Sequence, residues 1–184
     1  MPRFYTLPPV VIPYPYILIN CNRSEPGIQY IFRNMEFIES VIIDSGVEIF
    51  RDPSIKDYPH GHFDKLVNLY KRIKKLLSDR EVYVVIPDYP DDYNPKSLWV
   101  NGKDNVMRTL ENIVYALTSY NDVNWLIPVQ GHYRDPASVI KALELYVKYD
   151  VPIDNYIGIA NLCVEERTRI IVKTIQLVLS LIHI

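Results

Sequence analysis

The sequence has few cysteines and lacks common metal-binding and nucleotide-binding motifs. Its 184 residues include only two cysteines, Cys21 and Cys163, and these form no CxxC motif and no Cys/His cluster. A disulfide scaffold is therefore excluded, and a structural zinc site within the chain is not expected. His60 and His62 form a His-x-His pair, but no further ligand follows at a suitable spacing, so we expect no metal site. P-loop and GxGxxG motifs are also absent.

Long apolar runs and a strong excess of charge are missing too. No stretch approaches the ~20 apolar residues that cross a bilayer, and five prolines interrupt the apolar start, unlike a signal peptide. The net charge is −2, so any contact with nucleic acid must come from a local basic patch. We expect a cytoplasmic protein with one domain over 1–184, in which residues 1–15 form an irregular proline-rich arm.

What is present is an alternation of two patterns. Short β-branched runs alternate with longer segments whose apolar residues recur every three or four positions. The predicted strands are 16–20, 41–45, 82–87, 124–129 and 156–160. The predicted helices are 62–77, 105–120, 135–149 and 165–182. Asp104 or Asn105 is a plausible N-cap, and Asp135-Pro136 is a strong helix start.

This alternation predicts an α/β fold built from βα units around a parallel sheet. The strands are apolar on both faces, which is typical of a sheet that is covered on both sides. A long loop rich in Pro, Asp and Asn joins strand and helix over 87–104, and long loops in compact domains are often functional.

Polar or glycine residues lie at or near the end of four of the predicted strands. The carboxyl ends of parallel strands share one edge of a sheet or one face of a barrel, where active sites gather. Side chains that are far apart in the sequence would therefore converge on one pocket. The residues concerned are Asp44-Ser45-Gly46, Asp88, Gln130-Gly131 and Gly158.

Each of these residues also has a purely structural interpretation. Asp44 is equally suited to cap a turn, and Asp88 to be an ordinary turn aspartate before Tyr-Pro-Asp-Asp. Gln130-Gly131 alone is more typical of a loop than of a ligand contact, and Gly158 would serve close packing. The functional interpretation depends on their shared position at strand ends.

The order of these segments resembles the queuine tRNA-ribosyltransferase (tRNA-guanine transglycosylase) superfamily, including its relatives that insert 7-deazaguanines into DNA. The matching segments are "DSGVEIF", "IPDYP", "PVQGH" and "YIGIANLC", which correspond to the family patterns DSGGFQ, a strand-end Asp, VQG and IGGLAVG. The resemblance runs from about residue 16 onward and implies a (β/α)8 TIM-barrel type fold. Five to six βα units would make this an incomplete barrel.

The resemblance also implies a role for each matching residue. Asp88 would accept the N1–H and N2–H2 donors of guanine, and Gln130-Gly131 would donate to O6, helped by a backbone N–H near Gly158 and Ile159. Asp44 would be the acid/base residue, and Ser45 would bind the base or orient Asp44. The target base must leave the helical stack to reach such a site.

The sequence departs from the family pattern at three places. Val47 stands where the family has the second glycine of DSGG, the glutamine of GGFQ is not preserved, and Ile159 replaces another glycine. The family nucleophile is an aspartate after the next strand, which we expect beyond Ile184, as we do the Cys/His zinc set. We therefore expect no cofactor within this chain. We interpret the chain as a C-terminally truncated fragment, inactive alone, or as one whose final residues are not native. We expect apolar surface to be exposed on 156–160 and the last helix.

Two classes of function remain. The first is base exchange that inserts a 7-deazaguanine into tRNA or DNA, and the second is a noncatalytic α/β module that binds a purine or nucleic acid. The expected partners are the 7-deazaguanine base, tRNA or DNA and a second copy in a homo-oligomer, with no membrane.

Overall fold

The computed structural model describes residues 3, 5–8, 13–91, 98–153, 156–160, 162 and 165–182. The fold is α/β: five parallel strands form one sheet in the sequential order β1-β2-β3-β4-β5, and helices alternate with them along the chain. The chain divides into two compact units. The first contains Met1–Gly46, Pro59–Val85 and Tyr120–Trp125, and the second contains Val47–Tyr58, Ile86–Ser119 and Leu126–Ile184.

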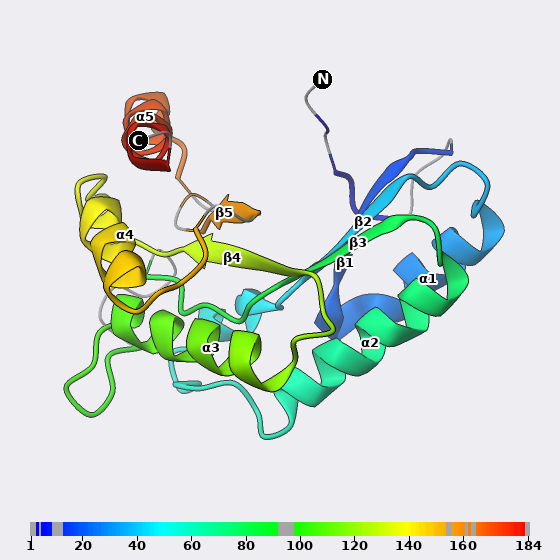
Figure 1. Cartoon of the computed structure of the whole chain (residues 1–184), viewed down its shortest axis with the longest axis horizontal. Helices are drawn as coiled ribbons and strands as arrows, with labels where there is room; N and C mark the ends of the chain where they lie inside the picture. The colour runs from blue at the N-terminus through cyan, green and yellow to red at the C-terminus, as the bar shows by residue number, and fades with distance from the viewer. Residues whose placement is uncertain are drawn as a thin grey trace. The chain divides into compact units, whose positions relative to one another are not determined.

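The first unit contains three parallel strands and the two helices that follow the first two of them. The strands are β1 (Tyr16–Asn20), β2 (Ser40–Asp44) and β3 (Glu81–Val85), and the helices are α1 (Ser24–Arg33) and α2 (His62–Leu76). Alternate strand residues such as Ile17, Ile43 and Val84 are buried, and most of those between them are half-buried. Figure 1 shows α1 and α2 on the same side of these strands. One sheet face is therefore more fully covered here than the other, although the apolar runs predicted cover on both.

The predicted arm is partly paired with the sheet. Thr6 forms a parallel bridge with Ile17 through hydrogen bonds from its N–H to Tyr16 O (3.1 Å) and from Leu18 N–H to its carbonyl (2.9 Å). The Tyr5 hydroxyl also lies 2.8 Å from Ser40 Oγ. The outer edge of β1 is therefore covered at this point. Residues 1–2, 4 and 9–12 of the arm lie outside the described part of the chain.

The second unit contains the later elements. They are the short helix η2 (Val47–Arg51), α3 (Asn105–Ser119), most of β4 (Trp125–Val129), α4 (Ser138–Lys148), β5 (Ile157–Ile159) and α5 (Thr168–Ile182). The helix α4 packs against α3 and α5 (Figure 1). A buried cluster of Val47, Phe50, Tyr89 and Leu98 joins η2 to the segments after β3. It fixes the chain that leaves β3, where Asp88 lies.

The end of the described chain exposes apolar side chains, as the sequence predicted. Tyr156, at the start of β5, is 62% exposed, and Val172, Ile175 and Leu179 of α5 are 45%, 37% and 45% exposed. The last three recur at spacings of three and four, so they form a stripe along one side of α5. The proposed homo-oligomer stays a prediction. No helix in the described ranges is both long and apolar enough to cross a membrane.

One predicted helix start is shifted, and another is confirmed. The Asp135-Pro136 pair precedes a turn, and α4 begins only at Ser138, whose N–H donates to Asp135 O (3.1 Å). In α3 the choice between two N-caps is settled, because Asp104 Oδ1 accepts the Met107 N–H at 2.8 Å. This is the contact of an N-cap side chain with the third helical residue.

The Asp104 cap gives a direct test of how α3 is stabilised. We expect Asp104→Ala to lower the free energy of unfolding by about 1 kcal/mol, because the Met107 N–H loses its acceptor. Asp104→Asn keeps a capping oxygen, so it should lower the free energy of unfolding by only about 0.3 kcal/mol. Urea denaturation of both variants measures the difference. Equal losses would show that the charge of Asp104, and not its capping oxygen, stabilises the structure.

Candidate functional site

A polar cluster of the first unit lies at the carboxyl ends of β1 and β2. Asn20 and Asp44 are register partners, and Asn20 Nδ2 donates to Asp44 Oδ2 at 3.3 Å. The Gly46 N–H donates to Asp44 Oδ1, also at 3.3 Å. The half-buried carboxylate is thus held by a side-chain donor on one oxygen and by a backbone donor on the other. These contacts fit both an oriented acid/base group and a turn that the carboxylate stabilises.

The residue after Asp44 is fixed from two sides. Ser45 is fully buried, and its carbonyl accepts from Cys21 Sγ (3.1 Å) and lies 2.8 Å from His62 Nε2. Because a carbonyl only accepts, we assign the proton to His62 Nε2. His62 is therefore a buried structural contact of the Asp-Ser-Gly turn, and the His-x-His pair does not act there as a unit. Cys21 and His62 were not predicted here, because nothing in their spacing links them to Ser45.

Gly46 completes this turn in a conformation that favours glycine. Its φ is +84°, and a Cβ atom would lie 2.4 Å from Asn22 Nδ2 and 2.7 Å from Cys21 Sγ. The Asn22 amide is itself engaged, since Nδ2 donates to Gly46 O at 3.1 Å and Oδ1 accepts from Lys65 Nζ at 2.9 Å. The backbone of the Asp-Ser-Gly turn is therefore tightly specified.

In the second unit, Asp88 is presented by a segment whose backbone is hydrogen-bonded on both sides. The Tyr58 hydroxyl donates to Asp88 O (2.8 Å), and Asn112 Nδ2 donates to the carbonyl of Pro87 (2.8 Å). The next backbone N–H donates to Thr109 Oγ1 (3.1 Å). Asp88 itself is buried. Two of these three donors and acceptors come from α3, so this helix fixes the strand end that carries the carboxylate.

Gln130 lies at the end of β4 and is also buried. Its Nε2 donates to the carbonyl of Gly131 at 2.7 Å, and its Oε1 has no hydrogen-bond partner within the described ranges. The hydroxyl of Tyr146, from α4, donates to Pro128 O at 2.7 Å. Burial raises the pKa of Tyr146 above its usual range; a hydrogen bond from the Gln130 backbone opposes this, and the nearby charge of Asp88 adds to it. The Gln130 backbone therefore contacts this buried phenol, and the charge of Asp88 acts on it.

A further polar cluster lies beside these residues in the sequence and was not predicted. Buried Asp91 accepts from Asn105 Nδ2 (3.1 Å) and from the Tyr133 N–H (2.8 Å). His132 lies between two carboxylates, with Nδ1 3.8 Å from Asp91 Oδ2 and Nε2 3.5 Å from Asp104 Oδ2. The only signal in the sequence was the histidine that directly follows "VQG". The partners come from separate segments, so their meeting could not be predicted.

Gly158 and Ile159, which were predicted to offer a backbone N–H to the base, also take part in strand packing. A Cβ at Gly158 would lie 2.6 Å from Leu126 Cδ2, so the glycine allows β5 to pack closely on β4. Ile159 is half-buried and pairs with Val129 in the parallel register. The N–H of the next residue, Ala160, donates to Val129 O at 3.1 Å. Strand packing is thus one reason for glycine at 158, as one interpretation of the sequence held.

The predicted residues therefore fall into two groups. Asp44 and Ser45 lie in the first unit, whereas Asp88, Gln130, Gly131, Gly158 and Ile159 lie in the second. Within the second unit, Asp88 and Gln130 are both buried, and the Tyr146 hydroxyl is hydrogen-bonded to the Gln130 backbone. Their convergence with Asp44 on one pocket stays a prediction. Cys163 lies outside the described residues.

Tyr146 makes stability at high pH a test of this arrangement. Its folded pKa is raised above the unfolded value of about 10, so its contribution is complete below about pH 10 and is lost as pH rises further. We expect the free energy of unfolding to fall above pH 10 by up to about 1.4 kcal/mol per pH unit from this group. Tyr146→Phe should remove that part of the slope in urea denaturation, and exposed Tyr149→Phe should not. An unchanged slope in Tyr146→Phe would contradict the burial of this phenol.

Nothing in the described part of the chain groups three or more His, Cys, Asp or Glu side chains as a metal site would require. The groups found near the strand ends are carboxylates, a carboxamide, an imidazole and backbone groups. Comparison of the chain with protein-family models, with curated proteins and with solved structures found no match.

Proposed function

We propose that the chain is a guanine base-exchange transglycosylase of the superfamily that it resembles, and that it recognises the base through Asp88 and Gln130. The observation that supports this is the placement of both residues. Both are buried, and they follow the neighbouring strands β3 and β4. In α/β folds, ligand sites usually lie at the ends of neighbouring strands and contain a few buried polar groups.

The two side chains match the edge of guanine that carries its donors and its acceptor. An ionised Asp88 accepts from N1–H and N2–H2. Gln130 Nε2 has two hydrogens, of which one is donated to Gly131 O, so the second can be donated to O6. A 7-deazaguanine has the same edge, so the same contacts bind the incoming base. The base substrate would be delivered by tRNA or DNA.

Asp44 is proposed as the acid/base residue, with Ser45 next to it. Its carboxylate is oriented by Asn20 and by the Gly46 N–H, which would hold it in place for proton transfer to the leaving base. No described residue is assigned as the nucleophile.

The proposal includes a fold type, in which the five strands belong to a (β/α)8 barrel. The sequential strand order β1 to β5 is the order in which a (β/α)8 barrel adds its units. A doubly wound sheet instead reverses its strand order at a switch point, and no reversal occurs among these five strands. The strand order therefore favours the TIM-barrel type.

A noncatalytic purine-binding module is the second candidate. It is favoured by the packing of Gly158 against Leu126, which explains this glycine without a bound base. Ile159, in place of a family glycine, adds side-chain bulk at the same point. Such a module would bind the base through Asp88 and Gln130 but would not exchange it.

Two measurements separate these candidates. The first is calorimetric titration of 7-deazaguanine bases into the chain, and the second is incorporation of radiolabelled guanine into tRNA and duplex DNA. The incorporation assay uses protein expressed from the full reading frame that contains residues 1–184. Base binding with incorporation supports the transglycosylase, and base binding without it supports the noncatalytic module. Absence of base binding contradicts both.

A further inference from the structure

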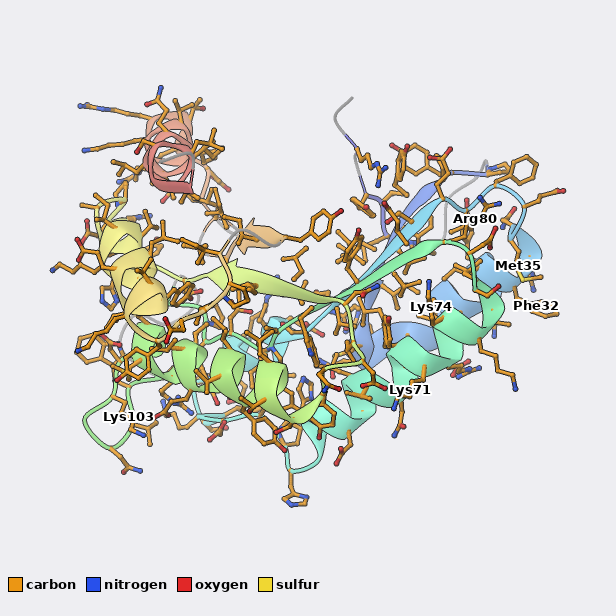
Figure 2. All side chains as sticks on the ribbon, in the orientation of Figure 1. Phe32, Met35, Lys71, Lys74, Arg80 and Lys103 are labelled. Atoms are coloured by element: carbon orange, nitrogen blue, oxygen red, sulfur yellow. The ribbon has the colours of Figure 1, made fainter. Side chains whose placement is uncertain are left out.

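The helices α1 and α2 of the first unit enclose an open groove of about 730 Å³. Its apolar part is formed by Ile28 and Phe32 of α1 and Leu76 of α2. Phe32 is 64% exposed, and it is labelled in Figure 2 near Met35, which follows the same helix. A large aromatic side chain at the edge of a groove, not covered by its own chain, is typical of a protein–protein contact.

Apolar exposure continues beyond the end of α1. Met35 and Phe37, in the segment that leads to β2, are 39% and 49% exposed. Together with Phe32 they place three large apolar side chains within six residues on the surface of the first unit. Single exposed apolar residues need no explanation, but a group of them beside a groove indicates a docking site.

The rim of the groove is basic. Arg33, Arg72 and Lys75 line it, and Glu25 is the one acidic residue among them. Arg72 pairs with Glu25 at 2.8 Å, whereas Arg33 and Lys75 form no ion pair within the described ranges. The rim therefore has an excess of positive charge in a chain whose net charge is −2.

The basic character extends along α2. This helix carries five Lys or Arg residues and one Asp, and Figure 2 labels Lys71 and Lys74 on it. Lys71 pairs with Asp122 at 3.1 Å, and Lys74 Nζ donates to Arg80 O at 2.7 Å. Lys75 stays available at the groove itself. The free positive charge is thus concentrated where the apolar side chains are exposed.

The groove lies away from the polar cluster of the first unit. The helix α1 leaves the carboxyl end of β1 and returns the chain to the amino end of β2, so its last turn is remote from Asp44. In the same way, the last turn of α2 leads to the amino end of β3. A ligand in the groove would therefore not contact Asp44, and this inference does not depend on the proposed function.

We propose that the α1–α2 groove binds an acidic amphipathic helix from a partner protein. The apolar face of such a helix would pack on Ile28, Phe32 and Leu76, and its carboxylates would meet Arg33, Arg72 and Lys75. The apolar floor favours a peptide over nucleic acid, because protein–nucleic acid interfaces are polar. A second copy is disfavoured, because no helix in the described part of the chain carries more than one acidic residue.

Fluorescence polarisation with a designed peptide tests this. The probe is a labelled helical peptide of about 16 residues, with Leu at i, i+3, i+4 and i+7 and Glu on the other face. Its control has Lys in place of every Glu. We expect the acidic peptide to bind and the basic peptide to bind at least roughly tenfold more weakly. Binding should weaken as salt rises from about 50 to about 300 mM.

Variants locate the site. Arg33→Glu combined with Lys75→Glu should weaken acidic-peptide binding by roughly tenfold or more, and Phe32→Ser should do so through the apolar face. Lys148→Glu, an exposed charge reversal on α4, is the matched control and should leave binding unchanged. Amide exchange should show protection by the peptide over 25–33 and 72–76. Thermal midpoints confirm that each variant is folded.

Several outcomes would overturn the proposal. One is no binding of the acidic peptide at about 1 mM, and another is equal binding of both peptides. A third is binding that survives both the charge reversal and Phe32→Ser. Finally, tighter binding of single-stranded DNA or of vesicles with anionic lipid, lost in the Arg33→Glu/Lys75→Glu variant, would assign the groove to a different class of ligand.

Discussion

Asp88→Asn is expected to weaken the binding of guanine or a 7-deazaguanine by about 2–4 kcal/mol. An ionised Asp88 accepts from both N1–H and N2–H2, whereas an asparagine in its place would turn an NH2 donor toward the donors of the base. A site built to hydrogen-bond its ligand discriminates strongly, because mismatched buried groups are left unpaired. Asp88 is buried, so water cannot replace the lost acceptor. Calorimetric titration of the free bases measures the loss.

Two variants serve as controls for this prediction. Asp44→Asn should change proton transfer much more than base binding, because Asp44 is proposed as the acid/base residue. Asp91→Asn alters another buried carboxylate of the second unit, whose contacts with Asn105 and Tyr133 are structural. It should therefore lower stability more than base affinity. Equal losses of base binding in Asp88→Asn and Asp44→Asn, or none in Asp88→Asn, would contradict this division of roles.

The strands could be predicted because their patterns are local. Runs such as "YILIN" and "VYVV" combine β-branched residues with sharp ends, and β1 occupies the predicted 16–20. The helix α1 was missed, because Pro26 and Gly27 interrupt its pattern. Pro26 lies in the first turn, where its missing N–H has no intrahelical partner to lose. A Cβ at Gly27 would lie 2.9 Å from Ile19 Cγ1, so the glycine permits close packing of α1 on β1.

The site could be predicted only in its strand-end residues. Asp44, Asp88 and Gln130 follow apolar runs, and the parallel sheet makes such positions recognisable from the sequence. Their neighbours come from distant segments: Cys21 and His62 meet Ser45, and Asp104 meets His132. Contacts of this kind depend on helix packing and loop paths, which leave no periodic signal in a single sequence. The same holds for the α1–α2 groove, since α1 itself was not predicted.

In the Asp-Ser-Gly turn, the addition of a single methyl group should cause a large loss of stability. We expect Gly46→Ala to lower the free energy of unfolding by about 2–4 kcal/mol. Part of this loss arises because Gly46 has a left-handed backbone, with φ at +84°, which strains any residue that has a Cβ. The rest is the added Cβ, which would lie 2.4 Å from Asn22 Nδ2 and 2.7 Å from Cys21 Sγ.

Those two neighbours cannot move without losing contacts of their own. Asn22 Nδ2 donates to Gly46 O, and Cys21 Sγ donates to Ser45 O. Gly61→Ala is the matched control, because Gly61 has a similar φ of +75° but no atom within 4 Å of its added Cβ. It should cost only about 1–2 kcal/mol of backbone strain. Urea denaturation of both variants measures the two losses. Equal losses would show that Asn22 and Cys21 yield freely, and the turn would then not be fixed by its packing.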